Sequence, residues 1–233
     1  MTQVYEVSDA PLEYDYIDQL LRQQTPISLS KQAQEKIVNC RNYLDRCMTE
    51  RDMPIYGINT GFGSLYSKNI STDDLSQLQL NLVQSHACGM GELVPDEIVR
   101  LMLFLKIRSL AYGHSGVQLS TVKRLVDFYN HSVLPIVYQQ GSLGASGDLA
   151  PLAHLSLPLL GMGEVHYNDT RQDTTHVLAK LGWKPLRFQA EEGLALLNGT
   201  QFMSAYGVWS VFQSQRLLKL SNLIGALSLE AFD

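Results

Sequence analysis

The sequence is short of several residue types, and each shortage excludes a class of protein. Its 233 residues include only three cysteines, Cys40, Cys47 and Cys88. This odd number, without the spacing of a zinc site, argues against a disulfide framework or a metal site, so we expect reduced, buried thiols in a cytosolic protein. The 18 basic residues form no cluster and are outnumbered by 23 acidic ones, which argues against a nucleic-acid partner.

Long apolar runs and targeting signals are also missing. No apolar run reaches the length that spans a membrane, and the N-terminus lacks the basic segment and apolar core of a secretory signal. We therefore expect a cytoplasmic protein without a membrane partner. With 45% hydrophobic and 18% charged residues, the chain is long enough for one packed domain and short for two large ones.

Helical patterns dominate the chain and predict a mainly α fold. The predicted helices cover residues 12–24, 31–51, 75–87, 95–110 and 121–130. Ser30 is the expected N-cap of the second helix, and apolar residues around most of the circumference of 95–110 predict a buried helix. The polar stretch 168–182 is expected to be an irregular surface excursion with one small helix. Residues 194–233 are predicted as one long helix, in which the chain stops without a Gly or Pro signal.

One glycine-rich stretch stands out in the middle of the chain. Residues 141–152 have the sequence GSLGASGDLAPL, with Ala145, Ser146 and Gly147 at its centre. The glycines allow backbone turns that a side chain forbids, although composition alone favours a simple turn before a helix. A nucleophile elbow is excluded because Asp148 stands where its second glycine belongs, and phosphate-binding and dinucleotide-binding glycine motifs are absent.

Three further segments carry polar groups of chemical interest. Tyr56 opens the stretch 56–64, YGINTGFGS, whose glycines predict a loop that fits a mobile lid, although a surface turn is the simpler interpretation. Ser85-His86 stands at the end of a predicted helix, where a lone histidine is more often a capping residue. Asn198-Gly199 is typical of a turn.

Together, these four segments resemble the aromatic amino-acid ammonia-lyases. The glycine-rich stretch, the YGINTGFG string, the Ser-His pair and the LNGT string at 197–200 occur in the order found in that family. In the family the central tripeptide cyclises on itself. The resemblance implies that the amide nitrogen of Gly147 attacks the carbonyl carbon of Ala145, and that two waters are lost, one with the hydroxyl of Ser146. The product is a methylidene-imidazolone ring (MIO), so neither an external cofactor nor a metal is expected.

The resemblance also implies roles for the other residues. Tyr56 aligns with the base that removes the β-proton, Gly63 lies where the backbone closes on the substrate, and Asn198 hydrogen-bonds the substrate near the reacting centre. Members that act on histidine carry Ser-His at the position of Ser85-His86, phenylalanine lyases usually an aromatic residue and Leu, and tyrosine lyases usually His-Leu. The imidazole of His86 can hydrogen-bond a polar substrate ring. The implied reaction is elimination of ammonia from L-histidine to give urocanate, the first step of histidine degradation.

The family's architecture sets the remaining expectations. It implies a loop-rich, ring-bearing N-terminal domain at residues 1–193, followed by the truncated start of a long-helix bundle at 194–233. Family members are longer homotetramers whose C-terminal part supplies an arginine for the substrate carboxylate and a second tyrosine, so we expect an N-terminal fragment that is inactive alone. Two alternatives stay open: another aromatic amino-acid lyase or aminomutase, and a non-catalytic scaffold or subunit partner.

Overall fold

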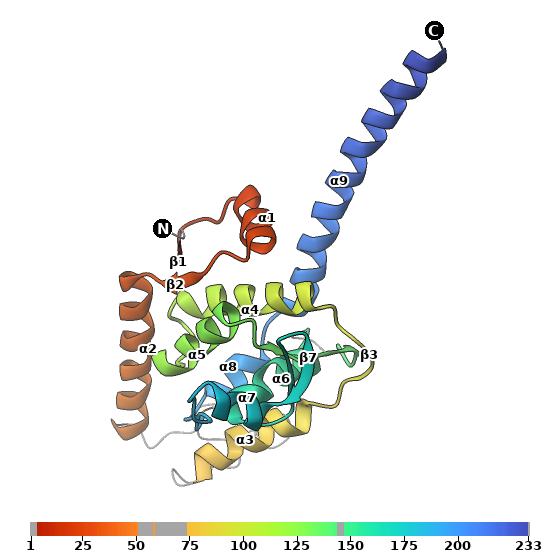
Figure 1. Cartoon of the computed structure of the whole chain (residues 1–233). Helices are drawn as coiled ribbons and strands as arrows, with labels where there is room; N and C mark the ends of the chain where they lie inside the picture. Colours follow the sequence, from red (N-terminus) through yellow and green to blue (C-terminus); the bar gives the residue numbers. More distant parts are fainter. Residues whose placement is uncertain (1–3, 51–57, 59–73, 144–146, 233) are drawn as a thin grey trace.

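The fold is mainly α-helical, as the sequence predicts. The computed structural model describes residues 4–50, 58, 74–143 and 147–232. A body of helices and short strands surrounds helix α4 (Asp96–Ala111), and the last helix, α9 (Gln201–Phe232), projects from that body (Figure 1). Within α4, 11 of the 16 residues are buried, which confirms the prediction of a buried helix. The charged residues among those that are buried, Arg100 and Lys106, are therefore of interest for the site.

The N-terminal elements pack against α4. They are β1 (Tyr5–Val7), α1 (Tyr14–Gln23), β2 (Ile27–Leu29) and α2 (Lys31–Glu50). The two strands pair in parallel, with α1 as the connection between them. The hydroxyl of Ser30 accepts the backbone N–H of Ala33 at 3.0 Å, so the predicted N-cap of α2 is confirmed.

The middle of the chain brings two distant segments together. Its elements are α3 (Leu75–His86), β3 (Met90–Leu93), α5 (Leu119–Asn130), β4 (Leu134–Pro135), β5 (Tyr138–Gln140), α6 (Leu149–Ser156) and the 3₁₀ helix η3 (Leu157–Leu160). Strands β3 and β5 pair antiparallel, with Met90 opposite Gln140. The segment that follows α3 therefore lies beside the segment that leads into the glycine-rich stretch.

Two predictions about the C-terminal half are wrong in part. Its elements are β6 (Glu164–Tyr167), β7 (Thr170–Asp173), α7 (Thr174–Lys180), α8 (Glu192–Leu197) and α9. The small helix expected in the polar stretch 168–182 is present as α7. The rest of the stretch is not irregular, because Asn168 and Asp169 turn the chain at φ of 49° and 58° into a hairpin strand. The predicted helix 194–233 is interrupted between α8 and α9, where Gly199 has a φ of 146°.

The prediction of buried thiols is wrong. Cys40 and Cys47 are partly exposed on α2, and Cys88 is exposed on the turn after α3.

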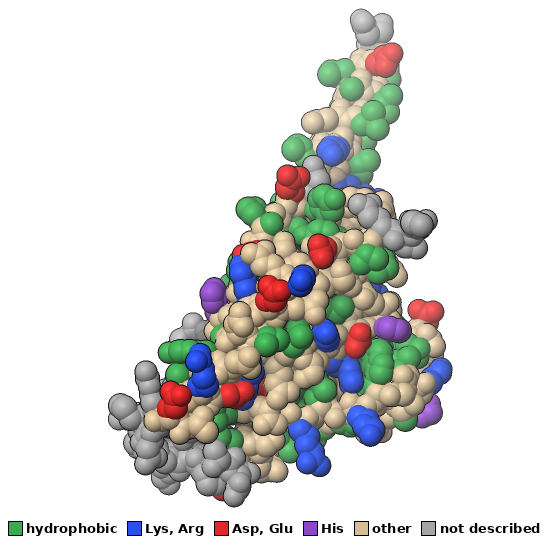
Figure 2. Space-filling view, turned by 90° about the vertical axis from the view of Figure 1, so that its left-hand side faces the viewer, with side chains coloured by type: hydrophobic (Ala, Val, Ile, Leu, Met, Phe, Trp, Pro, Cys, Tyr) green, Lys and Arg blue, Asp and Glu red, His purple; other side chains and the backbone are tan. Residues whose placement is uncertain are grey.

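Hydrophobic side chains line the projecting part of α9 (Figure 2). The exposed ones include Leu217, Leu218, Leu220, Leu223, Ile224, Leu227 and Leu229. Among the described residues, no helix combines the length and the apolar character needed to cross a membrane.

Candidate active site

The glycine-rich stretch is anchored to the turn between α8 and α9. Gly147 has a φ of 98°, and a Cβ atom added there would lie 3.2 Å from the carbonyl oxygen of Gly199. The two glycines form an isolated parallel bridge, and the N–H of Asp148 donates to the same Gly199 carbonyl at 3.4 Å. Both the positive φ and the close approach require glycine at position 147.

The beginning of the same stretch presses against the turn after α3. Gly141 has a φ of 129°, and a Cβ atom there would lie 3.1 Å from the Cα atom of Gly89 and 3.2 Å from the Cβ atom of Ala150. Gly89 lies three positions after His86. The glycine-rich stretch therefore contacts two of the three segments in which the sequence predicts substrate-binding residues, those of His86 and Asn198.

Asp148 is a buried carboxylate that joins this stretch to α9. Its side chain is 2% exposed, accepts the Ser142 hydroxyl at 3.1 Å, and accepts the backbone N–H of Met203 at 2.9 Å. Met203 lies in the first turn of α9, where free N–H groups and the helix dipole favour a negative charge. In the sequence, Asp148 only excludes a nucleophile elbow, although its place next to Gly147 is a usable signal.

Lys106 is a buried cation on the other side of the same turn. Its side chain comes from α4 and is 1% exposed. The ammonium group donates to the carbonyl oxygens of Ala195 at 2.9 Å and Asn198 at 2.8 Å, and lies 3.5 Å from Oε1 of Gln201. Burial lowers the pKa of Lys106 to about 7, although the charge of Asp148 acts in the opposite direction. Sequence reasoning missed this residue, whose signal was a charge within the mostly apolar run of α4.

His86 is a partly buried residue that ends α3. Its Nδ1 lies 2.8 Å from the carbonyl oxygen of Leu82, one helical turn earlier, and 3.3 Å from the hydroxyl of Ser85. A carbonyl oxygen only accepts hydrogen bonds, so Nδ1 carries the hydrogen in the neutral ring. The remaining nitrogen, Nε2, is then an acceptor that a ligand N–H group can use.

The turn after His86 is supported by a second histidine. His154 of α6 is 9% exposed, and its Nε2 accepts the backbone N–H of Gly89 at 3.0 Å. Its ring packs edge-on against Tyr138 with a centroid distance of 5.1 Å. Burial lowers the pKa of His154, which favours the neutral ring that this contact needs.

Asn198 is the exposed residue that ends α8. Its backbone leaves the helical conformation with φ −76° and ψ 132°, while its N–H still donates to Leu194 at 2.9 Å. The carbonyl oxygen of Asn198 is the one that Lys106 binds. The backbone that bears the Asn198 amide side chain is therefore held in place by Lys106.

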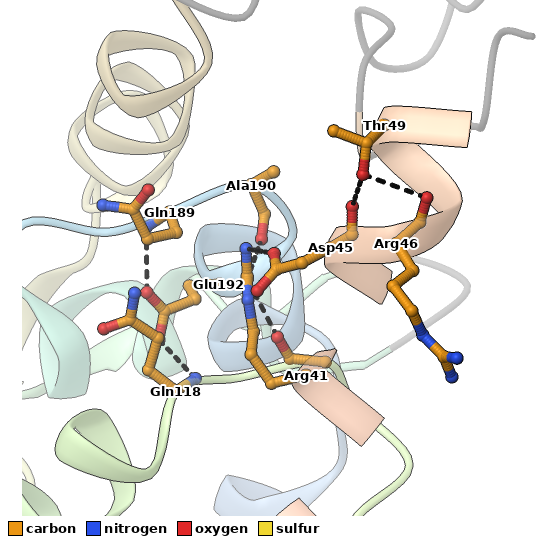
Figure 3. A network of polar contacts seen from close by, with 9 residues as sticks. Arg41, Asp45, Arg46, Thr49, Gln118, Gln189, Ala190 and Glu192 are labelled. Carbon is orange, nitrogen blue, oxygen red and sulfur yellow. Dashed lines mark hydrogen bonds and ion pairs between the residues drawn. The ribbon is translucent and has the colours of Figure 1, made fainter. Parts of the chain in front are cut away.

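The beginning of α8 is fixed by a polar network (Figure 3). Glu192 is fully buried and accepts the backbone N–H groups of Gln118 at 3.0 Å and Gln189 at 2.8 Å. Arg41 reaches in from α2 and donates to the carbonyl oxygen of Ala190 at 2.9 Å. These contacts fix α8 to α2 and to the segment before α5.

The elements next to the described site residues pack against one another. Helices α3, α6 and α8 pack against one another in pairs. His86 ends α3, Gly147 lies two residues before α6, and Asn198 follows α8. The other predicted site residues, Tyr56, Gly63, Ala145 and Ser146, lie outside the described residues.

A cavity of the described residues lies elsewhere. It has a volume of about 640 Å³ and is lined by residues of α1, α4, α9 and the β6–β7 hairpin, among them Arg100, His166 and Trp209. None of the predicted site residues that the structure describes lines it. Within the part of the chain that the structure describes, no group of three or more His, Cys, Asp or Glu side chains is placed to hold a metal ion.

Comparisons with known proteins point to one family. Residues 12–233 match the family described as aromatic amino acid lyase. The chain is 44% identical to the histidine ammonia-lyase of Deinococcus radiodurans over 225 residues, which is 97% of this chain and 43% of that protein. The chain thus spans less than half the length of this curated relative.

Solved structures show the same likeness in three dimensions. The crystal structure of histidine ammonia-lyase from Trypanosoma cruzi matches with a TM-score of 0.83 and 36% identity, over 92% of this chain and 41% of that one. Phenylalanine aminomutase from Pantoea agglomerans matches with a TM-score of 0.86 and 28% identity, over 93% of this chain and 42% of that one.

Proposed function

The chain belongs to the aromatic amino acid lyase family, and we propose that the whole protein eliminates ammonia from L-histidine to give urocanate. The observation that carries this proposal is the 44% identity to a curated histidine ammonia-lyase over 97% of the chain. The Ser85-His86 pair supports the choice of substrate. Because the chain spans less than half of that relative, the activity and the substrate are proposed for the whole protein.

The glycine-rich stretch fits the self-formed ring. Ring closure needs a compressed backbone at the attacking residue, and Gly147 has a φ of 98° and lies against Gly199 at a distance that leaves little room for a Cβ atom. Ala145, Ser146 and Gly147 are the residues that would form the ring. When present, it supplies an electrophilic carbon for the amino group of the substrate, a role that ordinary side chains cannot fill.

The other site residues bind the substrate and move its proton. His86 offers Nε2 as an acceptor for an N–H group of the substrate imidazole, because its Nδ1 is engaged by Leu82. The exposed amide of Asn198 hydrogen-bonds the substrate near the reacting centre. Tyr56 takes the β-proton, and since a phenol has a pKa of about 10 in water, its surroundings must favour the phenolate.

Intact-mass measurement combined with an assay for urocanate tests the proposal. The whole protein should be lighter than its sequence mass by two waters and should form urocanate from histidine. Ser146→Ala should have its full sequence mass and no activity, whereas Ser120→Ala, a change at an exposed serine of α5, should behave like the wild type. An unmodified mass in an active wild-type protein would contradict the ring.

One alternative within the family has an observation in its favour. The likeness to phenylalanine aminomutase, with a TM-score of 0.86, keeps an aminomutase reaction open. An aminomutase would return a β-amino acid, whereas a lyase releases ammonia and an unsaturated acid, so product analysis separates the two. A non-catalytic scaffold would form neither product from any aromatic amino acid.

The assembly and the division of the chain belong to the same proposal. We infer a cytoplasmic homotetramer, with a ring-bearing domain at 1–193 and the start of a central bundle at 194–233. The resemblance assigns carboxylate-binding groups to the C-terminal part of the family, so residues 1–233 alone should form no urocanate. The exposed leucines of α9 should also make this chain self-associate. Urocanate absorbance and light scattering on one sample check both expectations, and an active, monomeric chain would contradict them.

A further inference from the structure

Lys106 is a buried charge for which the proposed reaction has no use. It lies in the interior of α4 among residues of the main hydrophobic core, where an ammonium group is costly unless it is hydrogen-bonded. All three of its contacts belong to the segment 195–201, which is about 90 residues away in sequence. A lysine that served only the packing of α4 would not need three acceptors from one turn.

The contacts fall on both sides of the interruption between α8 and α9. Ala195 and Asn198 offer carbonyl oxygens from the end of α8, where unpaired carbonyls and the helix dipole attract a cation. Gln201 is the first residue of α9. Lys106 therefore stabilises the place where a helical sequence pattern is forced into a turn.

The turn that Lys106 stabilises also forms the wall beside Gly147. The carbonyl of Gly199 faces Gly147 and accepts the N–H of Asp148. Asp148 in turn binds the N–H of Met203. The backbone of Asn198 is thus set from one side by Lys106 and from the other by the glycine-rich stretch.

From this geometry we propose that Lys106 is a positioning residue for the proposed reaction: by binding the carbonyl oxygens of Ala195 and Asn198, it fixes the turn that presents the Asn198 side chain to the substrate. The inference rests on the proposed function for its catalytic part. Its structural part, the anchoring of the turn, is measurable without any substrate.

The kinetic test uses Lys106→Met in the whole protein, which keeps the length of the side chain and removes its donors. Misplacement of a substrate-binding group by about 1 Å can cost 10²-fold in rate, so we expect kcat to fall about 10- to 100-fold with the ring mass unchanged. Lys106→Arg, which keeps the charge and the donors, should recover most of this loss. Lys123→Met, at an exposed lysine of α5, is the matched control and should leave kcat unchanged.

A double-mutant cycle separates positioning from a general loss of structure. If Lys106 acts through Asn198, Lys106→Met should change kcat by less than about threefold in an Asn198→Ala background. Two losses that simply multiply would overturn the proposal. If Lys106→Met does not fold, Lys106→Gln, which keeps a donor without the charge, serves for the same cycle.

Hydrogen exchange tests the anchoring independently of catalysis. Amides of residues 194–203 should exchange faster in Lys106→Met than in the wild type or Lys123→Met, because the turn loses its buried donor. Unchanged exchange in this segment would overturn the proposal. Faster exchange in a protein whose wild type forms no urocanate would instead contradict the proposed function and leave the anchoring role in place.

Discussion

The residues of the candidate site fall into two groups that differ in burial and in what they bind. Lys106 and Asp148 are 1% and 2% exposed, and both bind backbone atoms of the segment 195–203. His86 is partly buried and Asn198 is exposed, and both are left with side-chain atoms that a ligand can reach. The first group, which we term the frame, holds the backbone, and the second group is the one that we propose contacts the substrate.

This difference predicts two kinds of mutational effect. Changes to groups that contact the substrate should alter kinetics and leave the free energy of unfolding nearly unchanged, since these groups pack against little. Changes to the frame should alter both, because a buried polar group that loses its partner is costly. Each of the following predictions tests one side of the comparison.

The largest effect is expected for Tyr56→Phe, on the contact side. Removal of a general base typically costs about 10²- to 10⁴-fold in rate, so turnover should fall by that amount in the whole protein. The ring mass and the melting temperature should stay at their wild-type values. Tyr112→Phe, at an exposed tyrosine after α4, is the control. A loss of only a few-fold would remove Tyr56 from the role of base.

A matched pair of glycine substitutions tests the frame. In Gly199→Ala the new Cβ atom would lie 2.1 Å from Oε1 of Gln201 at a φ of 146°, so the free energy of unfolding should fall by about 1–3 kcal/mol, with activity reduced as well. Gly207 lies inside α9 with open space around it, so Gly207→Ala should stabilise by up to about 1 kcal/mol. Urea unfolding measures both, and equal effects would contradict the special role of the turn.

His86→Leu tests the choice of substrate. Loss of one hydrogen bond to the substrate costs about 1 kcal/mol, so KM for histidine should rise about 5- to 10-fold, and phenylalanine should become a weak substrate. Stability should not change. His176→Leu, at an exposed histidine of α7, should leave the kinetics unaltered. Unchanged histidine kinetics in His86→Leu would take away the main local support for this substrate.

Glu191 lies outside both groups and tests the stability effect of a buried polar group by itself. Burial raises the pKa of Glu191 to about 7, although Arg41 acts in the opposite direction, and its Oε2 is buried without a hydrogen-bond partner among the described residues. The folded state therefore binds the proton more tightly than the unfolded state, whose pKa is 4.5. Ionisation of the buried Glu191 carboxyl group therefore lowers the free energy of unfolding. This loss of stability is absent below pH 4.5 and fully present above pH 7.

Glu191→Gln should accordingly raise the free energy of unfolding at pH 8 by about 1 kcal/mol, allowing for the partial exposure of the side chain. The gain should shrink as the pH falls toward 4.5. Denaturant unfolding at pH 5 and pH 8 measures the difference. An equal gain at both pH values would show that the carboxyl group does not titrate in this window.

Much of the fold follows from local patterns, whereas the frame does not. Helix α4 and the cap of α2 at Ser30 were predictable because periodicity and capping act within a few residues. At Gly199 the local signals conflict, since Asn198-Gly199 is typical of a turn while apolar helical patterns continue on both sides, and the prediction of one helix over 194–233 followed the second signal. The role of Lys106 depends on Asn198, which is 92 positions away, so no local pattern could indicate it. The contact residues were found only through the family resemblance.

Helix α9 connects the site to a remote part of the molecule. Its first turn binds Asp148, and its 32 residues extend about 48 Å, well beyond the body (Figure 1). A straight helix of that length is a lever: a rotation of about 5° at its base moves its tip by about 4 Å. Conversely, a contact that holds the tip of α9 within a few ångströms limits the angle of the helix at its base, where Met203 binds Asp148. A partner that packs on the exposed leucines of α9 would therefore act on the alignment of a hydrogen bond beside Gly147 from tens of ångströms away.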